Sequence, residues 1–275
     1  MGYDGVENMV GSFAVARRAL SRKKSYKERS ILRSSDGISC LLLASMIVAV
    51  WPSMAHAYRP FDSTDPAVAA PKEFEIELSP LSFRRNNSGQ TWISPQLKLN
   101  YGFAPNWELV VEGEGEHPRG SRSTLVGNAA FLKTVVREGT LQERLGPSAA
   151  LELGVLLPGV NDENGFGASW AGIVGGQWDW GAAHFNVAAN LTRSGRAEMF
   201  LGTIIEGPSD WAVRPVAELV YEREFGMTEV VAGLVGVIWE AKDDLAFDFA
   251  VRQADVNGQP ETEIRLGLTF AFSVR

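Results

Sequence analysis

Cysteine is almost absent from this chain of 275 residues, because Cys40 is the only one. The sequence after Cys40 therefore excludes disulfides, cysteine-ligated zinc, iron–sulfur clusters and thiol nucleophiles. Histidine is also scarce, and the three present are His56, His117 and His184. We therefore expect no metal site, no cofactor and no catalytic residue.

A long apolar run is missing as well. The best candidate, Ile38–Trp51, has about fourteen residues, whereas a membrane-spanning helix needs about twenty. It follows a basic stretch and precedes Ala55-His56-Ala57, the small-x-small pattern that signal peptidase accepts. We expect a cleaved signal peptide over residues 1–57 and a mature start near Tyr58. A retained helical anchor is the alternative.

Positive charge is scarce once that segment is set aside. Residues 1–57 hold eight of the 26 basic side chains and four of the 33 acidic ones, so the net charge of −7 becomes −11 for the remainder. Nucleic-acid binding needs a basic footprint, so we expect no nucleic-acid partner. Without a spanning helix, the remainder can cross a membrane only as a closed barrel of strands.

The sequence does contain a repeated alternation of apolar and polar residues. In Ile264–Phe272 large apolar residues alternate with polar or small ones, which gives a strand one apolar and one polar face. About twelve such segments follow one another from Glu73 onward, and Pro80 interrupts the first, which indicates a bulge. A series of dyad-alternating segments is the signature of a transmembrane β-barrel.

We therefore expect an all-β, antiparallel transmembrane barrel of about twelve strands over residues 73–275, after a periplasmic lead-in at 58–72. The phase of the alternation is left open over 125–136 and 229–240. Tight turns are expected at one end of the barrel and polar loops at the other. The loops are Arg84–Gln90, Glu116–Ser121, Gly159–Gly165 and Ala254–Pro260, and they are too short to form a deep plug.

The aromatic residues fall at the two ends of the expected strands. One group, which includes Trp107, Trp178 and Trp239, lies beside the tight turns, and a second, which includes Trp92 and Trp170, lies toward the loops. Two such girdles are typical of a barrel that spans a membrane. The alternative is a soluble β-sandwich whose core corners carry these rings.

Several segments resemble a bacterial outer-membrane family described as meta-pathway phenol-degradation or transporter-like proteins. They are Arg59–Asp65, Glu73–Glu77, Leu97–Phe103, Gly127–Lys133, Leu153–Gly159 and Trp239–Phe249. These are motifs of turns and strands, and no catalytic residue comes with them. The resemblance implies an outer-membrane barrel, and the family's description associates it with aromatic compounds.

The polar strand faces carry the charges that a membrane protein must keep away from lipid. We expect these side chains to face the lumen: Glu75, Glu77, Lys98, Glu108, Glu112, Glu114, Glu152, His184, Asn186, Glu198, Arg214, Glu218, Asp248, Arg252, Glu263 and Arg265. Carboxylates outnumber basic groups, which favours a water channel that prefers cations. The alternative is a network of ion pairs that partly fills the barrel.

The sequence thus predicts a monomeric protein of the bacterial outer membrane that passes small solutes by diffusion. Its partners would be outer-membrane lipid, the barrel-assembly machinery and the solute. Two alternatives remain. One is an outer-membrane lipid or peptide hydrolase with His184 as its base, and the other is a structural or adhesive barrel with a filled lumen.

Overall fold

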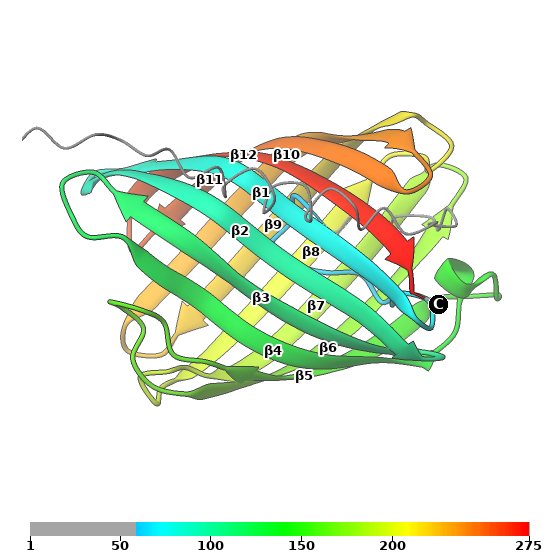
Figure 1. The fold of residues 1–275 in the computed structure, drawn as a ribbon, viewed down its shortest axis with the longest axis horizontal. Helices are drawn as coiled ribbons and strands as arrows, with labels where there is room; N and C mark the ends of the chain where they lie inside the picture. The colour runs from blue at the N-terminus through cyan, green and yellow to red at the C-terminus, as the bar shows by residue number, and fades with distance from the viewer. Residues whose placement is uncertain (1–58, 275) are drawn as a thin grey trace, which may run out of the picture. The chain divides into compact units, whose positions relative to one another are not determined.

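The protein is described from a computed structural model, which covers residues 59–274; the expected signal peptide lies outside the described residues. Within them the chain forms twelve strands and one 3-10 turn, η1 (Thr140–Gln142) (Figure 1). The strands are β1 (Glu73–Asn86), β2 (Gly89–Ala104), β3 (Trp107–Pro118), β4 (Thr124–Arg137), β5 (Ser148–Leu156), β6 (Gly167–Trp178), β7 (Gly181–Leu191), β8 (Ala197–Glu206), β9 (Val213–Glu224), β10 (Thr228–Lys242), β11 (Leu245–Val256) and β12 (Gln259–Ser273).

The strands form a single closed sheet. Each strand pairs antiparallel with its sequence neighbours, and β1 also pairs with β12. Closure leaves no unpaired strand edge. The predicted antiparallel barrel of about twelve strands is therefore confirmed. No helix of residues 59–274 is long and apolar enough to cross a membrane.

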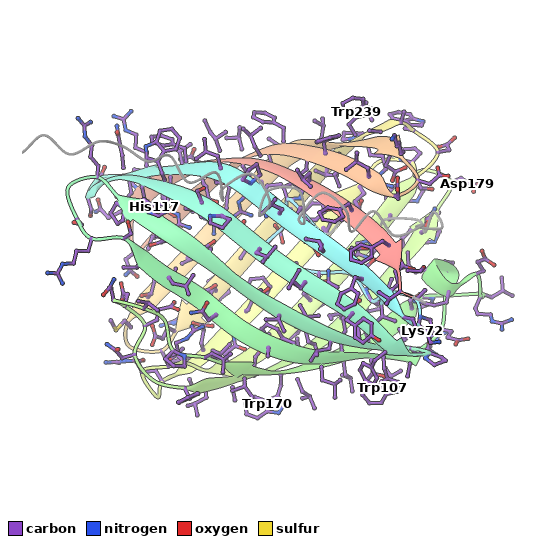
Figure 2. All side chains as sticks on the ribbon, in the orientation of Figure 1. Lys72, Trp107, His117, Trp170, Asp179 and Trp239 are labelled. Carbon is purple, nitrogen blue, oxygen red and sulfur yellow. The ribbon has the colours of Figure 1, made fainter. Side chains whose placement is uncertain are left out.

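The outer face of the barrel is apolar, as the alternation predicts. On β5, Leu151, Leu153 and Val155 are each about half exposed, at 49–52%. Figure 2 shows Trp107, Trp170 and Trp239 on the outside of the barrel, and all three are exposed. An apolar exterior with a polar interior is the reverse of a water-soluble fold and is typical of a barrel in lipid.

Two bulges decide which residues of β1 and β2 face inward. The register of β1 against β12 shifts between Leu78 and Leu81, which confirms the bulge predicted at Pro80. A second shift, between Ile93 and Gln96 of β2, was not predicted. Regular alternation from Leu97 back to Ile93 predicts both residues on the outer face, and this prediction is wrong for Ile93, because the shift inverts the phase and buries Ile93.

Strand β10 is apolar on both faces, which explains why its phase could not be read from the sequence. Val231, Val235 and Trp239 are exposed, whereas Leu234 and Ile238 are buried. The inner face of β9–β11, here called the apolar wall, contains two clusters of buried side chains. They comprise Val216, Ile238 and Ala246, against which Phe61 packs, and Val220, Val230, Ala232 and Ala254, against which Phe200 and Val256 pack.

The two ends of the barrel differ less than the sequence predicted. Tight turns follow β2, β6 and β10 as expected, and the longer connection after β4 contains η1. Two of the expected loops were too long, because β1 continues to Asn86 and β12 begins at Gln259. Asn257 and Gly258 both have positive φ, at 52° and 80°, which is the conformation of a two-residue hairpin turn.

Candidate functional site

The lumen contains a segment of the chain that precedes the first strand. Residues 59–71, here called the plug segment, carry polar side chains that are buried, among them Arg59, Ser63 and Asp65. The sequence predicted a lead-in here but not that it enters the barrel. Hydrogen bonds and ion pairs join this segment to the inner faces of the strands.

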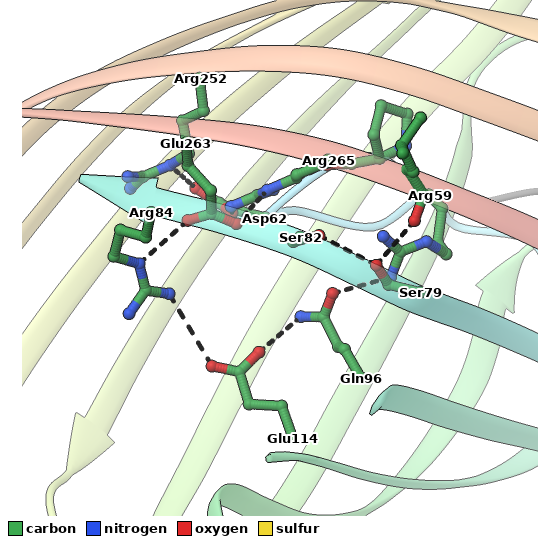
Figure 3. Close-up of polar contacts among 12 residues, drawn as sticks. Arg59, Asp62, Ser79, Ser82, Arg84, Gln96, Glu114, Arg252, Glu263 and Arg265 are labelled. Atoms are coloured by element: carbon green, nitrogen blue, oxygen red, sulfur yellow. Dashed lines mark hydrogen bonds and ion pairs between the residues drawn. The ribbon is translucent and has the colours of Figure 1, made fainter. Parts of the chain in front are cut away.

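Two arginines from neighbouring strands hold the Asp62 carboxylate (Figure 3). Arg252 Nε of β11 lies 2.7 Å from Asp62 Oδ2, and Arg265 Nη2 of β12 lies 2.7 Å from Asp62 Oδ1. Arg265 Nη1 also donates to the Pro60 carbonyl at 2.7 Å. Burial raises the pKa of the Asp62 carboxyl, but the charges of Arg265 and Arg252 outweigh it and hold that pKa below its usual range.

Backbone groups in the middle of the plug segment bond to side chains on the far strands. The amides of Asp62 and Ser63 donate to the two oxygens of Glu218, at 2.8 and 2.7 Å. Asn186 accepts from the Thr64 amide at 3.2 Å and donates to the Thr64 carbonyl at 2.7 Å. An amide side chain that binds both backbone groups of one residue fixes the path of the segment as a neighbouring strand would.

The ends of the plug segment are also fixed. Arg59 lies 3.5 Å from Asp248 Oδ2, and its Nη1 donates to Gln96 at 2.8 Å. Near the other end, the Ala69 amide donates to Glu108 at 2.6 Å. A Cβ atom at Gly102 would collide with the Ala69 carbonyl oxygen. A larger residue at Gly102 would therefore push the segment away from β2.

The plug segment lines two cavities of the lumen. The smaller has a volume of about 170 Å³ and is lined by Asp62, Ser63 and Thr64 together with strand residues such as Lys98. The larger, about 1150 Å³, opens toward the tight turns and is lined by Asp65 and residues such as Trp178. Because consecutive residues of one segment line different cavities, the segment lies at the boundary between them.

Six of the side chains predicted to face the lumen contact the plug segment, and they belong to five different strands. They are Glu108, Asn186, Glu218, Asp248, Arg252 and Arg265. The geometry thus brings together around one peptide segment residues that lie far apart in the sequence.

Most of the other predicted residues pair with polar side chains along the wall. Lys98 Nζ lies 3.3 Å from Glu112, and Glu263 lies 2.8 Å from Arg265. Four more have polar partners outside the predicted set. Glu77 accepts a hydrogen bond from Asn100, Glu114 from Gln96 and Glu198 from Asn190, and Arg214 lies 2.7 Å from Glu240. Glu75 is buried, and Glu152 lines the smaller cavity.

Two positive groups at the site were missed. Arg84, placed in a loop by the sequence, lies on β1 within 4 Å of four carboxylates, those of Glu114, Glu116, Glu261 and Glu263. Lys133 is buried and lies 3.8 Å from Asp65. Continuing the alternation from Ser82 to Arg84 would have placed Arg84 inside, whereas Lys133 lay in a segment of uncertain phase.

His184 is buried on the inner face of β7. Its Nε2 lies 3.2 Å from Glu206, which also lies 3.7 Å from Arg214. His184 therefore contacts a carboxylate rather than the serine hydroxyl that a hydrolase needs. Within residues 59–274 no group of three or more histidine, cysteine or acidic side chains is arranged to hold a metal ion.

A closed barrel with an apolar exterior and a charged interior defines the architectural class of outer-membrane barrels. No family model and no curated protein matches this chain. Among solved structures, a COG4313 outer membrane channel from Pseudomonas putida F1 aligns with a TM-score of 0.53 and 10% identity, over 78% of this chain and 100% of that one.

Two porins align similarly. The KdgM porin has a TM-score of 0.50 at 13% identity over 71% of this chain and 98% of its own. The NanC porin has a TM-score of 0.52 at 8% identity over 72% and 98%. The chain therefore has the fold of these outer-membrane channels, and the neighbours are porins and channels rather than enzymes.

Proposed function

We propose that this protein is a passive channel of the bacterial outer membrane for small solutes, narrowed by its own plug segment. The observation that carries the proposal is that residues 62–65 lie at the boundary between two cavities of a polar lumen. Side-chain contacts hold the segment there. The proposal includes cleavage of residues 1–57, a monomeric barrel and insertion by the barrel-assembly machinery.

The lumen wall supports a solute with both apolar and polar parts. The apolar wall of β9–β11 lies in the same lumen as the charged faces of β1–β3 and β12. A small aromatic compound with a polar group would contact both surfaces. This agrees with the association implied by the resemblance to the phenol-degradation family, and we propose such solutes as one class.

The channel is tested by refolding the full mature chain into planar bilayers and liposomes. We expect small, stable conductance steps and a reversal potential that favours cations, because carboxylates outnumber basic groups in the lumen. Replacing Glu112 and Glu152 by glutamine should shift the reversal potential toward the value of a channel without ion selectivity. If the folded protein shows no conductance and no solute leakage, the proposal is overturned and the second candidate is favoured.

The second candidate is a structural barrel with a filled lumen. The plug segment favours it, since contacts with Glu218, Asn186 and Arg265 fix the segment inside the lumen. Conductance of the folded chain distinguishes the two, because a permanently filled barrel passes no current.

The membrane position has its own test. Val235, in the middle of β10, is 65% exposed on the outer face. Val235→Arg should destabilise the barrel in liposomes by about 2–4 kcal/mol, because the charge would face the centre of the bilayer. Leu145→Arg is the matched control, since Leu145 is 96% exposed in the turn after η1; its effect should stay within about 0.5 kcal/mol. Urea midpoints of both variants measure this, and equal midpoints would contradict a lipid-facing β10.

A further inference from the structure

Asp62 is bound in the manner of a ligand. Its two oxygens face guanidinium groups of different strands, each at 2.7 Å. We propose that Arg252 and Arg265 form a carboxylate-binding site which Asp62 of the same chain occupies, and that a solute carboxylate exchanges with Asp62 and loosens the plug segment. This inference rests on the proposed function, since it identifies a solute class for the channel.

The two arginines are positioned independently of Asp62. Arg265 Nε donates to Glu263 at 2.8 Å, and Arg252 Nη1 lies 3.7 Å from Glu261. On the paired strands, Arg252 lies opposite Glu263, so both guanidinium groups come from one short stretch of the wall. A site held by its surroundings keeps its geometry when the ligand leaves, which favours exchange over collapse.

A solute can reach this site from the lumen. The Asp62 side chain is 21% exposed and lines the smaller cavity of about 170 Å³. A cavity of about 150 Å³ accommodates benzene, so this one has room for a carboxylate of similar size beside Asp62. The arginines themselves are nearly covered, at 12% and 9% exposure, which limits their contacts to what enters between them.

The two guanidinium groups explain why a carboxylate and not a neutral molecule should exchange. Glu218, Glu222 and Glu263 lie near the same site and repel the Asp62 carboxylate, so the bonds from Arg252 and Arg265 are what holds it there. When Asp62 leaves, an incoming carboxylate restores both the charge and the two guanidinium bonds. A neutral amide restores neither fully. Hydrated chloride supplies charge without the planar pair of oxygens that two guanidinium groups bind.

Hydrogen exchange of the full mature chain, refolded in liposomes, measures the segment directly. The amides of Asp62, Ser63 and Thr64 are hydrogen-bonded to the wall, so their exchange reports loosening. Benzoate and acetate are the probes, benzamide and acetamide are the neutral controls, and sodium chloride matches the ionic strength. We expect the carboxylates alone to accelerate exchange over residues 60–65, in a saturable manner.

Asp62→Asn is the principal variant. It should accelerate exchange of the same amides about tenfold or more without any probe, because it removes the charge from the bonds to both guanidinium groups; tenfold corresponds to about 1.4 kcal/mol. Added benzoate should then have no further effect. Asp162→Asn is the matched control, since Asp162 is exposed in the loop before β6, and it should behave as the wild type.

Arg252→Lys keeps the charge but loses the Nε donor, so it should raise the half-maximal benzoate concentration several-fold. Arg252→Lys serves as the test variant if Asp62→Asn does not refold. Equal acceleration by benzoate, benzamide and chloride would overturn the inference, as would slow exchange in Asp62→Asn. Because exchange is measured without current, a channel that fails to conduct while benzoate loosens the segment would contradict the proposed function alone.

Discussion

Deleting residues 59–69 should raise the single-channel conductance of the refolded protein several-fold. The deletion removes the segment at the boundary between the cavities of about 170 and 1150 Å³, and bore decides conductance in barrels of this size. Ala70–Lys72 are retained, because the Ala70 carbonyl accepts from Glu73 and the Lys72 amide donates to Gly102. These bonds fix the start of β1.

The barrel should survive this deletion. Its closure depends on the ladder between β1 and β12, which does not involve the plug segment. The side chains that lose partners, Arg252, Arg265 and Glu218, would face a wider and water-filled lumen where charges are hydrated. Heat-modifiable migration on gels verifies the fold before recording.

A same-length glycine–serine replacement of 59–69 separates the volume of the segment from its anchors. The replacement keeps the length of the segment but removes the ion pairs of Asp62 and Arg59. Its conductance should therefore fluctuate between that of the wild type and that of the deletion. Identical conductance in the wild type, the replacement and the deletion would mean that ions already bypass the segment.

The sequence predicted the barrel well because lipid imposes a strict rule on it. Wherever a strand faces lipid on one side and charges on the other, as in Leu151–Val155, the alternation is visible residue by residue. The prediction failed where that contrast disappears. β10 has apolar residues on both faces, and a bulge inverted the phase at Ile93.

The plug segment could not be predicted for a different reason. Residues 59–71 have no periodicity, and their position depends on contacts with strands more than 100 residues away, such as Glu218 and Asn186. Arg59–Asp65 carries a family resemblance but no sequence signal for a position inside the lumen. The excess of inward carboxylates was visible, but two of the basic groups that it pairs with, Arg84 and Lys133, were not.

Replacing Arg265 by methionine should cost about 1.5–3 kcal/mol of unfolding free energy. Arg265 is 9% exposed and binds Asp62, Glu263 and the Pro60 carbonyl. Methionine has a similar length but no charge, so Asp62 and Glu263 each lose one of two basic partners, while Arg252 stays 2.7 Å from Asp62 and Arg84 stays 3.2 Å from Glu263.

Arg144→Met is the matched control. Arg144 is 70% exposed and lies 3.6 Å from Glu138, so its loss should cost less than about 1 kcal/mol. Urea unfolding in liposomes, followed by tryptophan fluorescence, compares the two midpoints. Adding Asp62→Asn to Arg265→Met should not recover the loss, because Asp62 keeps Arg252 as a partner at 2.7 Å and its neutralisation would take that partner from Arg252.

The size of the Arg265 effect also bears on the state of the lumen. A large cost means that water does not replace the lost partners, and the charged network is then a packed part of the fold. A cost no greater than that of Arg144→Met would mean that water already hydrates Asp62 and Glu263 in the folded barrel. In that case the ion pairs add little stability, the plug segment is weakly held, and conduction through the wild-type protein needs no displacement of the segment.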